Sequence, residues 1–249
     1  LLVVLAAGSS LFGQKPALDH SVYDSWQSLG QPVISDNGSW AASTVNPQQG
    51  DGLLWLFSLQ AGTRDSVPRG SSPVFSPESR YMACQVLPPY EEVRQAKKKK
   101  LKEDQMPKNS LEILILSEGR RMKADRVKSY ALPTEGSQWM AYLHEKALPE
   151  KSIADSAGAP DSLKGKGKKK TEPKGTDFVM VNPLINREYR FPDVTEYTVA
   201  RYGSIISFIQ EFPDTNKTSH IRITVFDTDK EQTSVVFEDY GDARKIACD

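Results

Sequence analysis

The chain has 249 residues, which is enough for one large all-β domain or for two ordinary domains. Its 32 basic residues balance 32 acidic residues, so no overall field attracts nucleic acid or an anionic membrane, and we expect no nucleic-acid partner. The two cysteines, Cys84 and Cys248, are too few for a disulfide framework and are predicted to be free, mostly buried thiols on different repeats.

The first 13 residues form an apolar run that changes to small residues, as in the second half of a secretory signal peptide. The run is much shorter than the ~20 apolar residues of a membrane-spanning helix, so we expect no membrane span. We therefore predict an exported protein, periplasmic or secreted, with residues 1–13 as a signal-peptide remnant and cleavage near Gly13. A buried N-terminal strand is the alternative, and Lys15 and Pro16 directly after the run disfavour it.

The next part of the chain contains a repeated sequence segment. Residues 32–45 reappear without a gap as residues 73–86, an offset of 73 − 32 = 41. Trp139 stands in a third copy where Trp40 and Tyr81 stand in the first two, and a weaker fourth copy covers 201–208. The period fits a propeller blade of roughly 40–45 residues. Trp40, Tyr81 and Trp139 should therefore occupy equivalent places on consecutive four-stranded sheets.

The second half of each repeat supplies a β-prone run, a polar turn and a return segment. These runs cover residues 53–59, 111–116, 178–181 and 220–226. The predicted fold is all-β: residues 14–249 form a partial β-propeller of four-stranded antiparallel blades, about four in number, with the start of a fifth at 246–249. An alternative, two stacked β-sandwich modules, would give breaks between modules rather than a regular period.

Two Lys-rich insertions interrupt the period, at residues 88–109 around Lys97–Lys100 and at residues 151–175 around Lys164–Lys170. Both are predicted to be surface loops. The second is expected to be disordered because its Ala, Gly, Ser, Pro and Lys residues offer little apolar surface to bury. A nuclear signal or an RNA-binding patch is disfavoured, since no aromatic residues are interleaved with the lysines.

Motifs for catalysis or metal binding are missing from the sequence. It has no nucleophile elbow, phosphate-binding loop or His-Glu-x-x-His motif, and His20, His144 and His220 lie on different repeats or before the first. We therefore predict no catalytic residue, no metal site and no cofactor in this chain. Residues 227–238 place acids at EF-hand positions, but Gln232 stands where that loop needs Gly, so a β-turn is predicted there.

Glu91 and Glu92 are the candidate binding residues, because adjacent carboxylates that project into a cavity can hold a cation such as a free peptide amine. The competing interpretation is charge pairing within the insertion, between these acids and Arg94 or the lysines. On this second interpretation the pair has no ligand.

Several segments resemble one protein family. Residues 17–26, 34–40, 47–51 and 90–111 are similar to the N-terminal propeller of exported bacterial serine peptidases of the prolyl oligopeptidase family, in its dipeptidyl aminopeptidase and acylaminoacyl-peptidase branches. The resemblance implies a C-terminal α/β-hydrolase domain that carries the Ser, Asp and His triad, and a propeller that filters peptide substrates by size. It also implies that Glu91 and Glu92 grip the substrate amine.

The predicted function is that of the substrate-gating propeller of an exported serine peptidase, with the catalytic domain outside this chain. The 249-residue chain alone is accordingly expected to hydrolyse no peptide bond. The alternative is a non-catalytic periplasmic propeller that binds proteins or glycans as a scaffold.

Overall fold

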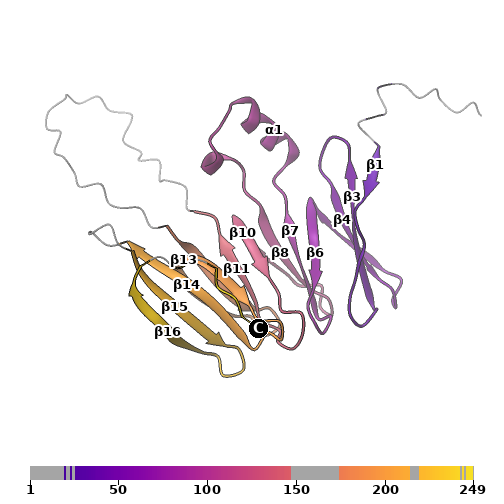
Figure 1. The fold of residues 1–249 in the computed structure, drawn as a ribbon. Helices are drawn as coiled ribbons and strands as arrows, with labels where there is room; N and C mark the ends of the chain where they lie inside the picture. Colours follow the sequence, from indigo (N-terminus) through magenta and orange to yellow (C-terminus); the bar gives the residue numbers. More distant parts are fainter. Residues whose placement is uncertain are drawn as a thin grey trace, which may run out of the picture.

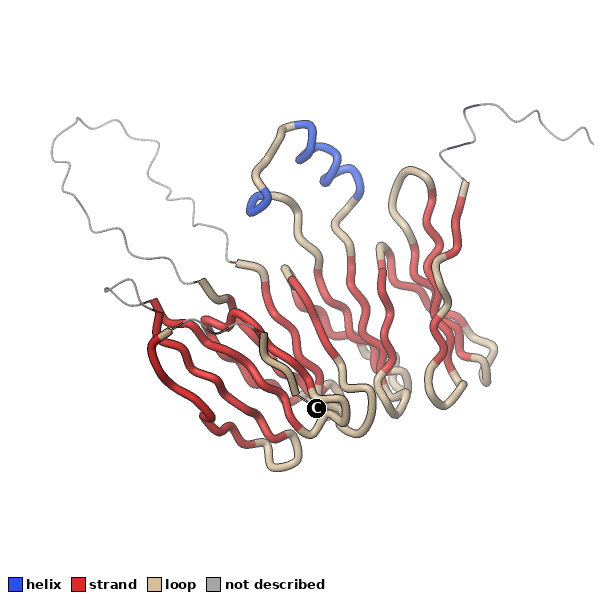
Figure 2. Tube along the Cα trace, in the orientation of Figure 1, coloured by secondary structure: helices blue, strands red, loops and turns tan. Residues whose placement is uncertain are grey.

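Antiparallel strands build nearly the whole molecule. The computed structural model describes residues 20, 23, 26–146, 174–213, 219–241, 243 and 245–248. Within these residues the strands form sheets of five, four and seven strands. The sheets stand side by side and each is turned relative to the next, like an open fan (Figures 1 and 2). This arrangement is a partial β-propeller without a closed barrel. The predicted signal remnant, and residues 151–173 of the second insertion, lie outside the described residues.

The first two sheets follow the order of the chain. The first consists of β1 (Gln27–Leu29), β2 (Val33–Ile34), β3 (Trp40–Pro47), β4 (Leu53–Ser58) and β5 (Arg64–Pro68). Both β1 and β2 pair with β3, so together they fill one strand position. The second sheet consists of β6 (Gly70–Phe75), β7 (Tyr81–Val86), β8 (Ser110–Ile115) and β9 (Arg121–Ala124). Helix α1 (Tyr90–Lys98) and a short 3-10 helix (Glu103–Gln105) lie in the connection from β7 to β8.

The third sheet contains two units joined through one bent strand. Its strands are β10 (Val127–Ala131), β11 (Met140–His144), β12 (Thr176–Asn182), β13 (Arg187–Val199), β14 (Ile205–Pro213), β15 (Ser219–Asp227) and β16 (Gln232–Tyr240). The first part of β13 pairs with β12, and the part from Val194 onward pairs with β14. The bend falls at Asp193, whose φ is 58°. We call the resulting units 1 (27–68), 2 (70–124), 3 (127–191) and 4 (194–240).

Each passage from one unit to the next uses a residue in the left-handed conformation. Arg69, Arg126 and Asp193 have φ values of 60°, 54° and 58°, and Lys245 after unit 4 has 63°. None is glycine, although this conformation costs other residues roughly 1–2 kcal/mol. The carbonyl oxygens of two of them accept from the following unit segments, Arg69 from Leu87 N–H at 2.9 Å and Arg126 from Glu145 N–H at 2.7 Å. The chain therefore turns in the same way at every junction.

The turn before the second strand of units 1 and 2 repeats in atomic detail. Ser35 N–H donates to the carbonyl of Trp40, and Ser76 N–H to that of Tyr81, both at 2.9 Å. The two serine hydroxyls accept in return from the N–H groups of Trp40 and Tyr81, at 3.0 and 3.1 Å. Trp139 directly precedes the second strand of unit 3. The predicted equivalence is therefore confirmed for Trp40 and Tyr81, whereas Trp139 lies one residue before its strand, in the seven-stranded sheet.

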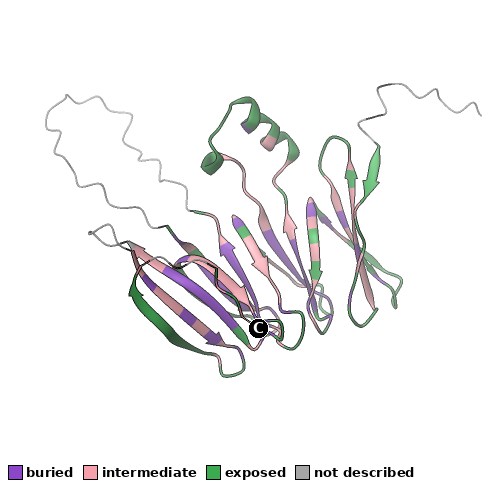
Figure 3. Cartoon of the chain, in the orientation of Figure 1, coloured by how far each residue is buried: buried purple, intermediate pink, exposed green. Residues whose placement is uncertain are grey.

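The apolar core lies between neighbouring units rather than inside any one of them. One cluster, around Leu54 and Met82, joins units 1 and 2, and another, around Tyr81 and Val179, joins units 2 and 3. A third cluster around Trp139 and Phe208 joins units 3 and 4. Buried residues accordingly fill the inner strands in Figure 3, while β16 is exposed along its whole length. A single unit could not bury its own faces.

The first insertion differs from the expected loop, because residues 90–98 are helical. Pro89 occupies the N-cap, Glu91 and Glu92 lie in the first turn, and Lys97 and Lys98 lie in the last. Acids at the start and bases at the end of a helix complement its macrodipole. Ala, Gln, Glu and Lys are also good helix formers. The predicted surface loop at residues 88–109 is therefore wrong for residues 90–98, because these local preferences favour a helix.

Candidate functional site

The two edges of the fan differ in the connections that they carry. Tight turns join the first strand of each unit to the second, and the third strand to the fourth; we call this side the turn edge. The connections from second to third strands begin on the opposite side, the insertion edge (Figure 1). Both Lys-rich insertions belong to connections of this kind, β7 to β8 and β11 to β12. The candidate residues Glu91 and Glu92 thus lie at the insertion edge of unit 2.

Helix α1 is tied to the first sheet at its start. The N–H of Tyr90 donates to Oδ1 of Asp51, in the turn between β3 and β4, at 2.7 Å. A carboxylate at this place satisfies one of the amide groups that a helix leaves unpaired at its N-terminus. The contact fixes the first turn of the helix, and with it Glu91 and Glu92, relative to two units.

The two glutamates have different surroundings. Glu91 accepts from Gln95 Nε2 at 2.7 Å and pairs with Arg94 Nη1 at 3.4 Å. The hydrogen bond from Gln95, aided by the charge of Arg94, lowers the pKa of Glu91. No polar partner of Glu92 is found among the described residues. The charge pairing with Arg94 that we weighed as the alternative is therefore present, but it occupies only one of the two acids.

A shallow depression lies against this helix. It measures about 320 Å³, and both glutamates, Gln95, Ala96, Lys99 and Leu101 contribute to its lining. Its acids can attract a cation, and Lys99 at the far side opposes them with a positive charge. The arrangement is that of an exposed surface site, since both partners of the Glu91–Arg94 pair are half exposed or more. Such exposed ion pairs contribute little to stability.

The first strands of the units are linked to one another by tyrosine hydroxyls. The Tyr130 hydroxyl on β10 donates to the carbonyl oxygen of Ser72 on β6, and the Tyr197 hydroxyl on β13 donates to Ser129 Oγ at 3.2 Å. Burial raises the pKa of both phenols, that of Tyr197 to about 12, so both stay protonated donors at neutral pH. The sequence analysis missed this series, although Arg69-x-x-Ser72 and Arg126-x-x-Ser129 repeat its spacing.

Glu196 continues the series one unit further. Its carboxylate accepts from the backbone N–H groups of Lys245 and Ile246, at 3.0 and 3.2 Å. Its position matches those of Ser72 and Ser129, three residues after the left-handed junction residue. The segment from Lys245 is thereby held beside unit 4 at the position where units 2 and 3 hold the units that follow them.

The histidines and cysteines form no catalytic arrangement within the described residues. His144 contacts the backbone carbonyl of Asp125, and His220 lies 3.5 Å from Glu238. No serine hydroxyl is bonded to a histidine ring in the described part of the chain. Both cysteines are free thiols, as predicted; Cys84 of unit 2 is buried, whereas Cys248, which follows unit 4, is only partly buried. Burial raises the pKa of Cys84 to about 12. The thiol of Cys84 is therefore protonated and unreactive at neutral pH.

Metal-ligand clusters and membrane-spanning helices are both absent from the part of the chain that the structure describes. The described residues contain no group of three or more His, Cys, Asp or Glu side chains placed to hold a metal ion. The EF-hand-like segment is the hairpin turn between β15 and β16, as predicted, and Asp227 Oδ1 accepts there from Asp229 and Lys230 N–H. Of the helices that the structure describes, none has the length and apolar character needed to cross a membrane.

Comparison with known proteins gives structural matches only. No family model matches the chain, and no curated protein does. The β-propeller domain of the Trilobed protease from Pyrococcus furiosus matches with a TM-score of 0.45 and 11% identity, over 86% of this chain and 58% of that chain. An acylaminoacyl peptidase from Pyrococcus horikoshii matches with a TM-score of 0.44 and 12% identity, over 88% of this chain and 34% of that one.

A prolyl endopeptidase matches with a TM-score of 0.41 and 10% identity, over 89% of this chain and 30% of its own. Peptidases of the prolyl oligopeptidase family with β-propeller domains are thus among the solved structures that this chain is similar to. The chain spans 58% of the length of the first structure and 34% of that of the second.

Proposed function

We propose that this chain is the substrate-gating propeller of an exported serine peptidase, and that a separate α/β-hydrolase domain performs the catalysis. In this proposal the units form part of a ring that surrounds the route of peptides to the hydrolase domain. The chain lends itself to this task because its first strands carry neutral hydroxyls and backbone groups rather than a nucleophile and a base. The predicted periplasmic or secreted location belongs to the same proposal and is supported by the apolar run at 1–13.

The observation that carries the proposal is the repeated junction. The chain turns with left-handed φ at residues 69, 126 and 193, and each time a strand follows beside the preceding unit; residue 245 after unit 4 has the same conformation. Units that are related by a constant turn approach a closed ring when enough of them follow one another. The uncovered β16 and its exposed Val235, Val236 and Phe237 favour a further unit on that side. We therefore propose four blades in residues 27–240 and the beginning of a fifth from Lys245.

Glu91 and Glu92 retain their proposed role in this scheme. Held by Asp51 at the insertion edge, they would attract the N-terminal amine of a peptide as it reaches the ring. Glu92 is the better placed of the two, since the carboxylate of Glu91 already accepts hydrogen bonds from Gln95 and Arg94.

The test is to express the longer reading frame that includes this chain and to compare it with residues 14–249 alone on chromogenic peptides. We expect hydrolysis by the longer protein, inhibition by a serine-directed reagent, and no turnover by the short form. Deleting the propeller units from the active protein should then relax its discrimination against large substrates. A longer protein without peptidase activity, or one that lacks a nucleophile elbow, would refute the proposal. The non-catalytic binding scaffold would then be the favoured function.

A further inference from the structure

The three seams between neighbouring units differ at their outer strands. Between units 1 and 2, Arg121 of β9 reaches Asp65 of β5 at 2.7 Å and closes the seam. Between units 3 and 4, Arg187 of β13 pairs with Glu231, at the turn before β16. Each of these seams is closed by a charged bridge between two units.

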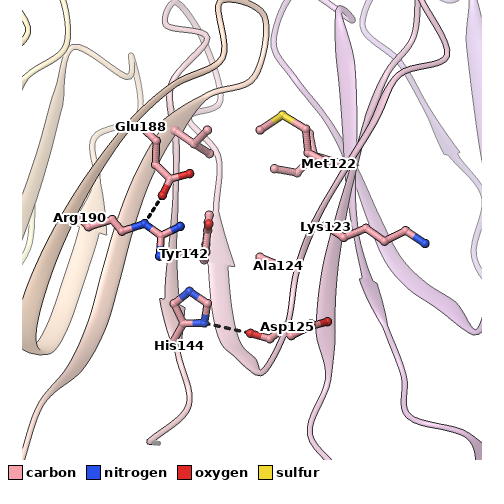
Figure 4. Close-up of a pocket in the computed structure, with 10 residues that line it drawn as sticks. Met122, Lys123, Ala124, Asp125, Tyr142, His144, Glu188 and Arg190 are labelled. Atoms are coloured by element: carbon pink, nitrogen blue, oxygen red, sulfur yellow. Dashed lines mark hydrogen bonds and ion pairs between the residues drawn. The ribbon is translucent and has the colours of Figure 1, made fainter.

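The outer strands of units 2 and 3, within the described residues, have no such bridge between them. The charged contacts across this seam lie outside those strands, from Lys108 to Glu145 at 3.6 Å and from Arg120 Nη2 to the carbonyl oxygen of Pro183 at 3.0 Å. Unit 2 presents Met122 and Ala124 of β9 there, and unit 3 presents Glu188 and Arg190 of β13. Glu188 and Arg190 pair with each other on the same strand instead of across the seam. Because two uncharged side chains, one of them very small, face this pair, a cleft of about 230 Å³ remains (Figure 4).

The cleft has an apolar floor. Ile113 and Val181 are buried members of the core cluster between the two units, and Met122 and Ala124 pack on that cluster from the side of unit 2. The volume is below the roughly 300–1,000 Å³ of sites for drug-sized ligands and matches one compact group. Lys123 also borders the cleft, but its side chain points away from it (Figure 4).

The polar groups gather on the wall formed by unit 3. Only Nε of Arg190 is bonded to Glu188, so the terminal nitrogens of the guanidinium keep donors for a second carboxylate. Their side of the guanidinium is turned toward Tyr142 and His144 (Figure 4). His144 Nδ1 lies 3.0 Å from the carbonyl oxygen of Asp125 and must donate to it, so Nε2 of the neutral ring is an acceptor and not a donor for a carboxylate. The carboxylate of Asp125, at the opposite wall, accepts from Ser110 Oγ at 3.2 Å.

We propose that this cleft binds small carboxylates that carry one compact apolar group. The apolar group lies on Ile113, Met122, Ala124 and Val181, and the carboxylate meets the free nitrogens of Arg190. Glu188 does not repel the ligand strongly, because Arg190 already balances its charge. The same chemistry is offered by a free arylalkyl acid and by the C-terminal residue of a peptide. Neither ligand depends on the function proposed above.

Methionine methyl resonances provide a direct test, because Met122 is the one methionine of five that lines the cleft. The protein is labelled at the methionine methyl groups and titrated with 3-phenylpropionate, with 3-phenylpropan-1-ol as the uncharged control. We expect a saturable shift of Met122 with the acid and weaker binding of the alcohol, while Met82 and Met180, in other clusters, stay unchanged.

Two substitutions examine the two halves of the site. Arg190→Gln should weaken binding of the acid about tenfold or more, as expected for loss of a charged hydrogen-bonding partner. Ala124→Leu should abolish binding by filling the floor. Arg187→Gln is the matched control, since Arg187 lies on the same strand but pairs with Glu231 across the other seam, and it should leave binding within about twofold. Unchanged Met82 and Met180 resonances, which report on the other two clusters, show that each variant is folded.

Gly-Gly-Phe and its C-terminal amide distinguish the two sources of the ligand. Binding of the peptide acid as strongly as 3-phenylpropionate, with loss on amidation, would identify peptide C-termini as ligands, whereas binding of the free acid alone would identify small acids. Both outcomes support the site. The proposal is overturned if no carboxylate shifts Met122 saturably, if the alcohol binds as well as the acid, or if folded Arg190→Gln binds the acid unchanged.

Discussion

The connections at the turn edge repeat from unit to unit, whereas those at the insertion edge vary. At the turn edge the same hydrogen bonds recur at Ser35 and Ser76, and left-handed residues recur at equivalent places, with φ of 68° at Gly38 and 55° at Ser79. At the insertion edge the connection from β3 to β4 takes a few residues, while that from β7 to β8 holds a helix. The difference indicates that the turn edge determines how units pack, and that the insertion edge can change without disturbing the fold.

The largest effect should come from the aromatic residue beside the turn edge of unit 3. Trp139 is 3% exposed and packs against Tyr189 and Phe226, with ring centroids 5.6 and 5.3 Å away. Trp139→Ala should lower the free energy of unfolding by about 3–5 kcal/mol, as for other large cavities. Trp40→Ala, at a half-buried position, should cost less. Urea unfolding of both variants measures this, and equal losses would contradict the ranking.

The stability cost of replacing a glycine of the turn edge should depend on the atoms near that glycine. Gly203 has φ of 67°, and an added Cβ would lie 2.7 Å from the Cβ atoms of Pro133 and Ser137. Gly203→Ala should therefore cost about 2–4 kcal/mol, the sum of a left-handed alanine and a clash. Gly38 has nearly the same φ but nothing within 4 Å, so Gly38→Ala should cost only about 1–2 kcal/mol. Thermal or urea unfolding that ranks Gly38→Ala as the worse variant would contradict this account.

The serine of the repeated turn should have a smaller effect. Ser76 is fully buried, and its hydroxyl accepts from Arg80 and Tyr81 N–H, at 3.0 and 3.1 Å. Ser76→Ala leaves these amides without that partner and should cost about 1–3 kcal/mol. Ser76→Thr keeps the hydroxyl and serves as the control. If both variants unfold at the same urea concentration as the parent, the hydroxyl does not stabilise the turn.

Substitutions at the insertion edge should change the stability least. Glu91→Gln removes an exposed pair on α1, and we expect no measurable change in the unfolding midpoint at pH 7. The pKa of Glu91 is lowered in the fold by Gln95 and Arg94, so its contribution is present above the unfolded pKa and disappears as the pH falls through the folded one. Parent and variant should therefore unfold alike at pH 7 and also at a pH below the folded pKa, where this small contribution is absent. A large loss at pH 7 would mean that α1 supports the core.

The fold could be predicted largely because the residues of the turn edge repeat in the sequence. Trp40 and Tyr81 recur at a fixed spacing with the serines that hold their turns, and such local patterns are visible in one sequence. The helix at the insertion edge was not predicted, since its stability depends on cooperating end charges and on Asp51 of another unit.

The candidate site could be predicted only in part. Glu91 and Glu92 were found because they are adjacent in the sequence, but their unequal surroundings depend on side-chain contacts within the helix. The cleft between units 2 and 3 brings together Ala124 and Arg190, which are 190 − 124 = 66 residues apart and follow no motif. Neither residue type is unusual where it stands. The two residues line one cleft only because units 2 and 3 pack against each other.

The left-handed junctions have a consequence for how such a molecule could arise and be altered. Every unit draws all of its strands from one uninterrupted stretch of chain, and the chain leaves it through a single residue at 69, 126 or 193. A gene segment cut at these codons would therefore encode whole units. Duplication or loss of such a segment would change the size of the molecule by complete steps, without shifting the register of any remaining strand.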